Sequence, residues 1–212
     1  MKSLEDLIAT LKEKKILKTS FIIKAFLTVD RANFVLPEYV KRSYEDLPLP
    51  LKEKQTISQP LTVAFMMELL QPDQHHRILD IGSGSGYTTA LLAEIAGPDG
   101  QVFAVERIKW LKEFGENNLK KLAYKNVRFR EGNGANGWSE HAPFDRILVN
   151  AAAPAVPQPL KEQLKTGGRL VIPLDNADGP ILLLEKRSPE QYAERRFPGF
   201  SFVPFIDDPS II

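Results

Sequence analysis

A short apolar run that ends in a glycine-rich turn is the feature that most constrains the fold of this chain. Residues 77–86 read RILDIGSGSG, and a helical pattern follows over 88–96. A second apolar run at 101–105 ends on Glu106, 20 residues after Gly86. Strand, glycine turn, helix, strand and acid are the parts of a βαβ unit that cradles a nucleotide, because glycines let the backbone approach a ligand and the acid accepts hydrogen bonds from ribose hydroxyls.

The spacing of the glycines narrows the kind of ligand. The loop at 82–86 reads G-x-G-x-G, whereas G-x-G-x-x-G suits a pyrophosphate at a helix N-terminus. Asp80, just before the turn, suits a cationic amino-acid tail better than a diphosphate. The pattern resembles the cofactor loop of methyltransferases that use S-adenosylmethionine (SAM). Two alternatives stay open: the loop binds NAD, or Glu106 is an acid that merely ends a strand.

Helical and strand patterns alternate along the chain from about residue 60. The expected helices are 61–70, 88–96, 109–122 and 158–164, and the expected strands are 77–81, 101–105, 127–131, 145–149, 169–173, 181–186 and 200–206. Such alternation predicts a doubly wound α/β fold: a mostly parallel, seven-stranded, Rossmann-like sheet with helices on both faces. Because no helix separates the last two strands, we expect them to form an antiparallel hairpin at one edge.

The first 58 residues predict a helical extension. Apolar residues recur at helical spacing over 4–15 and again over 20–29, and 33–50 is irregular and proline-containing. We therefore expect a cap at 1–58 and a SAM-binding domain at 59–212, packed together as one compact unit.

Composition excludes several classes of function. The net charge is +1, so no overall electrostatic attraction favours nucleic acid or an anionic membrane, and the basic residues within 109–130 are interpreted as a solvated face. Without cysteine the chain has no disulfide, thiolate metal site or cysteine nucleophile. His75, His76 and His141 do not have metal-ligand spacing, so we expect no metal. A charged N-terminus and the lack of an 18-residue apolar run predict a cytoplasmic protein, which we expect to be a monomer.

Four loops are expected to meet at one site. In a doubly wound sheet, ligands bind beyond the carboxyl ends of the strands, at the point where the strand order reverses. In this chain those ends are 82–86, Glu106, 132–134 and 150–154. Their convergence points to a binding site more strongly than any single motif does.

A second motif lies upstream, at residues 55–60, which read QTISQP. From physical chemistry alone these residues begin a helix, because Ser58 or Gln59 would cap it and Pro60 suits the first turn. The wider context supports a different interpretation, in which the motif carries function.

The chain resembles the protein-L-isoaspartate (D-aspartate) O-methyltransferase family. The matching motifs occur in order: YEDLPLP at 44–50, TISQP at 56–60, LDIGSGSGY at 79–87, GNG at 132–134, APFD at 142–145, AAAP at 151–154, LKTGGRLVIP at 164–173 and FVPF at 202–205. The glycine loop marks only the broad class of methyltransferases, whereas the block at 56–60 is much more specific to this family.

The resemblance implies a repair reaction on damaged proteins. SAM would methylate the α-carboxylate of an L-isoaspartyl residue, leaving S-adenosylhomocysteine, and the ester would close to a succinimide that reopens partly to normal aspartate. The expected partners are therefore proteins and peptides that contain isoaspartate. A carboxylate has a pKa near 4 and is already ionised at neutral pH, so no strong base is needed. Placing oxygen and methyl carbon in line contributes on the order of 7–11 kcal/mol.

The resemblance also assigns roles to residues on the substrate side. Ser58 matches the active-site serine, which would hold the substrate carboxylate or the polypeptide around it. Thr56 and Ile57 would line the same wall near the cofactor. Val203 is a further candidate on this side, although 202–205 is most simply an edge or core strand. Tyr87 is expected to pack in the core or border the site, as is Trp138.

The implied cofactor contacts come from the loops at the carboxyl edge. They are Thr56, Ile57, Asp80, Gly82, Ser83, Gly84, Gly86, Glu106, Asn133 and Gly134. Asp80 would lie near the methionine end of SAM and Glu106 would bind the ribose hydroxyls. Asn133 and Gly134 would flank the adenine.

Three departures from the family pattern leave alternatives open. Asn133 stands where the family usually has aspartate, which would make a charge-assisted bond neutral and roughly halve its strength. Lys52, Glu53 and Lys54 occupy a stretch where glycines are common, and Asn150 replaces a small or hydroxyl residue. The alternatives are a divergent SAM-dependent methyltransferase with another acceptor and a SAM-binding module without catalysis.

Overall fold

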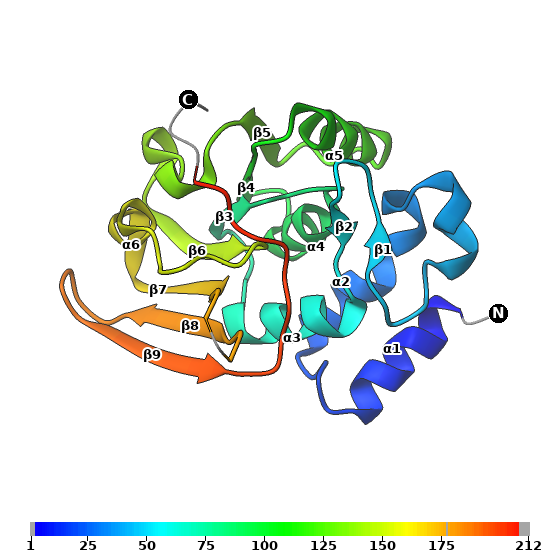
Figure 1. The fold of residues 1–212 in the computed structure, drawn as a ribbon, viewed down its shortest axis with the longest axis horizontal. Helices are drawn as coiled ribbons and strands as arrows, with labels where there is room; N and C mark the ends of the chain where they lie inside the picture. The colour runs from blue at the N-terminus through cyan, green and yellow to red at the C-terminus, as the bar shows by residue number, and fades with distance from the viewer. Residues whose placement is uncertain (1–2, 177, 208–212) are drawn as a thin grey trace.

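The computed structural model describes residues 3–176 and 178–207, and it is built around one seven-stranded sheet (Figure 1). The strand order is β5-β4-β3-β6-β7-β8-β9. The strands are β3 Arg77–Ile81, β4 Gln101–Glu106, β5 Val127–Glu131, β6 Phe144–Val149, β7 Leu164–Pro173, β8 Ile181–Lys186 and β9 Tyr192–Phe197. The first five in this order are parallel, and β8 and β9 are antiparallel additions at the edge. The doubly wound, mostly parallel sheet expected from the sequence is confirmed.

The strand order reverses at β3, which pairs with β4 on one side and with β6 on the other. Ile81 at the end of β3 lies opposite both Val105 and Val149. The three strands therefore end at the same level, and the loops that follow them start side by side. This is the place where doubly wound sheets bind ligands.

Both faces of the sheet are covered, which explains why its central strands are apolar at nearly every position. Four helices flank the sheet: α3 Pro60–Leu70, α4 Tyr87–Ala96, α5 Lys109–Lys121 and α6 Gln158–Gln163. Ile78 faces the core that contains α3, α4 and α5, and its neighbour Leu79 faces the core that contains α6. Side chains of a strand alternate between faces in this way.

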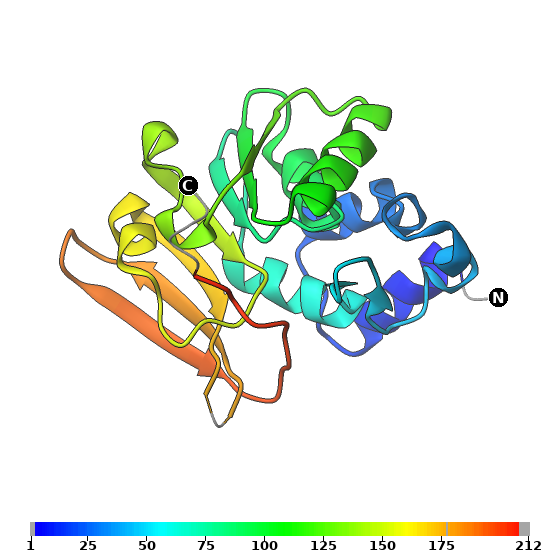
Figure 2. The same ribbon diagram turned by 45° about the horizontal axis from the view of Figure 1, so that its top comes forward.

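The N-terminal residues form a cap beside the sheet, at the opposite end from the antiparallel strands (Figure 2). The cap comprises α1 Leu4–Glu13, α2 Ser20–Thr28, the 3-10 helices η1 Arg31–Phe34 and η2 Pro37–Arg42, and a small ribbon of β1 Leu49–Pro50 with β2 Thr56–Ile57. Helix α2 packs on α4, and apolar residues of α1 and α2 join the core on that face of the sheet. Hydrophobic burial therefore attaches the cap to the main domain.

Two expectations about local structure are wrong. The strand expected at 200–206 does not form: apart from an isolated bridge between Ala152 and Pro204, residues 200–207 have no strand pairing. The last strand is β9, so an antiparallel hairpin does form at this edge, but β8 pairs with 192–197 and not with 200–206. β9 reads YAERRF and is largely exposed at the sheet edge, so it lacks the apolar pattern that identifies a strand. The segment 33–50 also contains 3-10 helices and β1 where irregular backbone was expected.

Candidate active site

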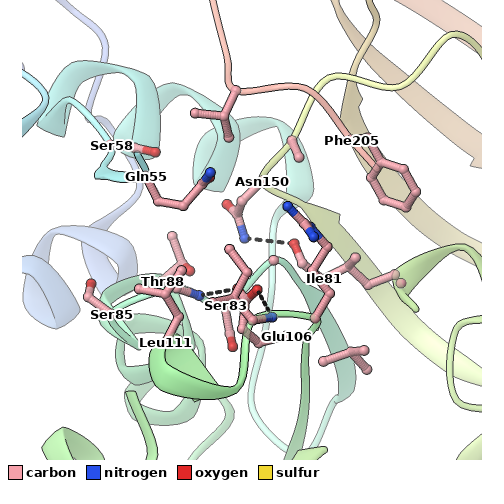
Figure 3. A pocket seen from close by; sticks show the side chains of 18 of the residues that line it. Gln55, Ser58, Ile81, Ser83, Ser85, Thr88, Glu106, Leu111, Asn150 and Phe205 are labelled. Carbon is pink, nitrogen blue, oxygen red and sulfur yellow. Dashed lines mark hydrogen bonds between the residues drawn. The ribbon is translucent and has the colours of Figure 1, made fainter. Parts of the chain in front are cut away.

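A pocket lies beyond the carboxyl ends of β3, β4 and β6. It contains about 890 Å³ of empty space, counting its open mouth. The four loops expected to converge do meet here, through residues of 82–85, Glu106, Gly132, Gly134, Asn150 and Ala151. Figure 3 shows Glu106, Asn150 and Phe205 around this pocket, with Ser58 on the side of the cap.

The glycine loop has a backbone conformation that only glycine adopts readily. Gly86 has φ +84°, and a Cβ there would come within 2.6 Å of Leu119 Cδ1 and 3.0 Å of the carbonyl oxygen of Gly115. The loop therefore packs directly onto α5. Gly82 donates its N–H to the carbonyl of Val105 at 2.8 Å, which fixes the start of the loop against β4 and keeps the loop at the pocket wall.

Glu106 joins the glycine loop to the strand that follows it. Its Oε2 accepts the N–H of Gly84 and its Oε1 accepts the N–H of Ile108, each at 3.0 Å. Burial raises the pKa of Glu106, and these backbone hydrogen bonds partly oppose the rise. Because each carboxylate oxygen has two acceptor positions, Glu106 keeps capacity to accept hydroxyl donors from the pocket that it lines.

Asp80 lies one layer behind the pocket and is absent from its lining. It is fully buried, and its Oδ2 accepts the hydroxyls of Thr89 at 2.6 Å and Thr88 at 3.2 Å. Its Oδ1 accepts Nδ2 of Asn150 at 2.7 Å. Burial raises the pKa of Asp80 to about 6, and the three hydrogen bonds oppose the rise. Thr88 and Asn150 line the pocket, so Asp80 orients two residues that a ligand would meet.

Asn133 is buried next to two pocket residues but is not itself among the lining residues. Its Oδ1 accepts the N–H of Ala135 at 2.9 Å, and its Nδ2 donates to Oδ1 of Asp207 at 2.7 Å. The neighbouring Gly134 lines the pocket, where a side chain would collide with Ile81. Asparagine at position 133 thus provides a donor that aspartate lacks, and this donor holds the C-terminal segment.

The motif at 55–60 begins α3, but its polar side chains do not cap the helix. Gln59 is the N-cap residue and makes no capping hydrogen bond. Instead, Oδ1 of Asp46 accepts the N–H of Leu61 at 2.9 Å. The proposed capping role of Ser58 or Gln59 is therefore wrong, whereas Pro60 does occupy the first turn. Ser58 is half-buried and lines the pocket, as do Thr56 and Ile57.

The C-terminal segment supplies Val203, a candidate named from the sequence, and three pocket residues that the sequence pattern did not single out, Pro204, Phe205 and Ile206. Ala152 donates its N–H to the carbonyl of Val203 at 2.9 Å and accepts the N–H of Phe205 at 2.7 Å. These bonds bring 203–206 to the pocket, across the carboxyl edge of the sheet (Figures 1 and 2). The apolar sequence FVPF was the available signal, and it was misread as a strand.

The two aromatic residues left open by the sequence divide between core and site. Tyr87 is buried against Phe26 and Phe34 and also lines the pocket. Trp138 packs edge-on against Phe103 and is absent from the pocket lining. Tyr87 therefore borders the site while it also joins the cap to α4.

The pocket fits a SAM-type nucleoside ligand in three respects. Gly84, at φ +52°, would have no neighbour nearer than 3.9 Å to a Cβ, so its surface is open to a ligand. The hydroxyl of Ser83 is buried in the pocket lining and has no hydrogen-bond partner within the described part of the chain. Glu106 offers acceptors for ribose hydroxyls.

The described residues offer neither a metal site nor a membrane-spanning helix. Across residues 3–176 and 178–207, no group of three histidine, aspartate or glutamate side chains could hold a metal ion. No helix in those ranges is long and apolar enough to span a membrane.

A Rossmann-like sheet with a glycine loop, followed by an acid at the end of the next strand, is the arrangement of a nucleoside-binding enzyme, and the G-x-G-x-G spacing favours the class of SAM-dependent methyltransferases. Comparison with known proteins then identifies the family. The family model for protein-L-isoaspartate(D-aspartate) O-methyltransferase matches residues 2–210. The chain belongs to the protein-L-isoaspartate(D-aspartate) O-methyltransferase family.

Individual relatives agree with this assignment. A protein-L-isoaspartate O-methyltransferase of Methanopyrus kandleri is 44% identical over 206 residues, covering 96% of this chain and 91% of the relative. One of Brucella anthropi is 42% identical, covering 87% of this chain and 85% of the relative. A solved protein-L-isoaspartate O-methyltransferase has a TM-score of 0.87 at 31% identity, over 95% of this chain and 65% of that longer chain.

A Plasmodium falciparum protein of this description, crystallised with S-adenosyl-L-homocysteine, has a TM-score of 0.88 at 24% identity, over 98% of this chain and all of that chain. This likeness concerns the fold. Family membership confirms the expected cofactor, SAM with S-adenosylhomocysteine as product. It also confirms the expected activity, methylation of L-isoaspartyl residues, and so argues against NAD and against a module without catalysis.

Proposed function

We propose that the pocket divides methyl transfer between two walls, with SAM on the glycine-loop side and the isoaspartyl peptide on the cap side. The observation that carries this proposal is that residues 55–58 of the cap and the loop 82–85 line one pocket. Residues 203–206 close the same pocket from the C-terminal side. A peptide that reached the methyl donor would therefore pass between Ser58 and this segment.

On the cofactor wall, Glu106 accepts hydrogen bonds from the ribose hydroxyls while its backbone contacts hold the loop. Gly82, Ser83 and Gly84 form the part of the turn that lines the pocket. Gly86 lies outside the lining and shapes the turn through its close packing on α5. Gly132 and Gly134 provide a side-chain-free wall for the adenine. Asn133 supports that wall from behind by holding Ala135 and Asp207.

Asp80 acts on the methionine end of the cofactor through its neighbours. Its carboxylate is buried and bonded to Thr88 and Asn150, which line the pocket. Above pH 6 it carries a negative charge, which favours a cationic ammonium group nearby. The role expected for Asp80 is thus electrostatic and indirect, and Thr88 and Asn150 make the direct contacts.

The substrate carboxylate, which accepts the methyl group, has to be positioned and does not need to be deprotonated by a base. SAM supplies a methyl group on a cationic sulfur, and the substrate carboxylate is ionised at neutral pH. The described lining residues include no histidine, lysine or cysteine that could serve as a strong base or nucleophile. Ser58 donates a hydrogen bond to one carboxylate oxygen and so orients the other towards the methyl group. Orientation of this kind contributes on the order of 7–11 kcal/mol in favourable cases.

The test is methyl transfer from labelled SAM to two peptides that differ only in aspartyl versus isoaspartyl linkage. We expect base-labile incorporation into the isoaspartyl peptide alone. Ser58→Ala should lower kcat with this peptide while the Kd for SAM stays within about twofold, since Ser58 does not belong to the cofactor wall. Ser139→Ala, an exposed serine outside the pocket, is the matched control. Unchanged turnover by Ser58→Ala would remove Ser58 from the reaction.

We further propose the division into a cap at 1–58 and a SAM-binding domain at 59–212, supported by the beginning of α3 at Pro60. A monomeric state, a cytoplasmic location and the lack of nucleic-acid binding stay predictions. Light scattering on the purified chain, fractionation of cells and a mobility-shift assay would check them in turn.

A further inference from the structure

Arg31 in η1 is a fully buried cation in the cap. It has no exposed surface, whereas arginine is almost never buried to this extent unless it is paired. Its Nη1 donates to the carbonyl oxygen of Ser43 at 2.7 Å. Its Nη2 donates to the carbonyl oxygens of Leu47 and Ser58, both at 3.1 Å. The guanidinium group therefore connects three separate backbone segments.

Burying the charge of Arg31 costs free energy of desolvation, so the contacts that compensate this cost indicate what the residue does. Burial lowers the pKa of Arg31 to about 10, and the nearby groups Tyr87 and Asp46 partly oppose this fall. The group therefore stays charged at neutral pH. A buried charge destabilises the fold unless its hydrogen bonds compensate. The acceptors of Nη1 and Nη2 are three backbone carbonyls of loops, and Nε has no partner among the described residues. An apolar residue would fill the same space without joining those loops.

One of those carbonyls belongs to the residue that faces the methyl acceptor. The turn that follows Ser58 is also bound to the segment 43–47, because Gln59 Nε2 donates to the carbonyl of Asp46 at 3.0 Å. Oδ1 of Asp46 accepts the N–H of Leu61 at 2.9 Å. Arg31 itself is absent from the pocket lining. It thus contacts Ser58 from behind, on the side opposite the reaction.

We propose that Arg31 is a positioning residue for methyl transfer: by holding the carbonyl oxygen of Ser58, it orients the Ser58 hydroxyl towards the substrate carboxylate. This inference rests on the proposed role of Ser58. A displacement of about 1 Å at such a position can lower the rate about 100-fold. Among the described residues, Arg31 makes no hydrogen bond to the glycine loop or to Glu106, so its loss should change peptide turnover and leave SAM binding unchanged.

The test compares Arg31→Lys with the native enzyme. Lysine keeps the charge but lacks the planar, multi-donor group that reaches three carbonyls together. We expect kcat for the isoaspartyl peptide to fall at least ~10-fold, with the Kd for SAM by calorimetry within about twofold. Leu11→Ala, a buried residue of α1 that lies outside the pocket, is the control for a destabilised cap. It should lower the thermal midpoint and leave kcat near that of the native enzyme below its transition.

A double-mutant cycle separates positioning from a general structural role. If Arg31 acts through Ser58, Arg31→Lys lowers kcat much less in the Ser58→Ala background than in the native one. Equal losses in both backgrounds, or a matching loss of SAM affinity, would overturn the proposal. Loss of activity by Ser58→Ala together with native kcat in Arg31→Lys would refute this inference alone. Native kcat in Ser58→Ala would refute the proposed function of Ser58 and, with it, this inference.

A second variant covers the case in which Arg31→Lys does not fold. Gln59→Leu removes the neighbouring bond between the same turn and Asp46. It should lower kcat for the isoaspartyl peptide several-fold, again with native affinity for SAM. Native kcat in Gln59→Leu would show that the attachment of this turn does not govern methyl transfer, and the proposal would fail.

Discussion

The pH dependence of SAM affinity between pH 5 and 8 tests the role of Asp80. Burial raises the pKa of its carboxyl group to about 6 in the folded protein, against an ordinary value of 3.8. Above pH 6 the group is a carboxylate behind the pocket wall, and below pH 6 it becomes neutral. If the carboxylate attracts the ammonium end of SAM through Thr88 and Asn150, the Kd should rise as the pH falls through 6. At pH 5 about nine in ten Asp80 groups are protonated, so the rise approaches 10-fold.

Calorimetry at pH 8, 7, 6 and 5 measures this rise directly, and proton release on binding at pH 6 gives an independent readout. Asp80→Asn is the matched variant, because its amide oxygen can still accept Nδ2 of Asn150 but cannot titrate. Its Kd should start weaker and stay flat over the same range. The pKa of Glu106 is also raised, so Glu106→Gln shows how much of the pH dependence of the Kd comes from Glu106 and how much from Asp80. A Kd of the native protein that is constant from pH 5 to 8 would refute the reasoning, as would the same slope in Asp80→Asn.

The same shift has an opposite consequence for the stability of the ligand-free protein. An acid whose pKa is higher in the folded state binds its proton more tightly there, so it stabilises the fold at low pH relative to high pH. Below pH 3.8 the Asp80 carboxyl group is protonated in both states and does not destabilise the fold. The loss of unfolding free energy develops as the pH rises from 3.8 to about 6. The rise of the Asp80 pKa from 3.8 to about 6 corresponds to a loss of roughly 3 kcal/mol of unfolding free energy once the group is ionised. The amide of Asp80→Asn does not ionise. We therefore expect the unfolding free energy of Asp80→Asn, compared with that of the native protein, to be higher at pH 8 than at pH 4, and urea denaturation of both proteins at the two pH values measures this difference.

Three further changes follow from the geometry of the loops. Glu106→Ala removes charged acceptors from the cofactor wall and should weaken SAM binding by about 1.5–3 kcal/mol; an unaltered Kd by calorimetry would exclude it from the site. Gly86→Ala places a Cβ 2.6 Å from Leu119 Cδ1 at φ +84°, so it should lower the unfolding free energy by more than ~1 kcal/mol, and native stability in urea would contradict this. Glu53 and Lys54 have φ of 58° and 57°, so Glu53→Gly and Lys54→Gly should each stabilise the fold by roughly 0.5–1 kcal/mol; lower thermal midpoints would show that the side chains matter more than the backbone.

The last two positions explain one departure from the family pattern. Glycines are common where Lys52, Glu53 and Lys54 stand, and two of these three residues adopt the left-handed backbone that favours glycine. The loop thus keeps a glycine-type conformation with other side chains. Lys52 also lies over the ring of Trp110, at 4.8 Å from its centroid. This cation–π contact holds the loop against α5 and offsets part of the backbone strain.

Secondary structure could be predicted best where burial dictated the residue pattern. Strands β3, β4 and β6 are largely buried on both faces, so their apolar runs matched the observed bounds within one residue. The edge strand β5, which has no fully buried residue, was also placed correctly. β9 was missed because its exposed edge position allows ERR in mid-strand. Residues 202–205 were misread because an apolar run looks the same whether it packs in a sheet or, as here, lies beside a pocket.

The order of motifs along the chain was enough to indicate the nucleotide loop, the acid Glu106 and the block at 56–60. These signals are local, since a strand, a glycine turn and a helix start each impose residue types on a few consecutive positions. The sequence by itself therefore determined the fold class, the cofactor and the family.

Only the tertiary structure decided which polar groups support the site. Arg31 reaches the carbonyl of Ser58, Asn150 reaches Asp80, and Asn133 reaches Asp207, across 27, 70 and 74 positions of the chain. A donor and an acceptor so far apart leave no periodic trace in the sequence. One member of each pair, Arg31, Asp80 or Asn133, is buried, and a buried polar group without a partner would destabilise the fold.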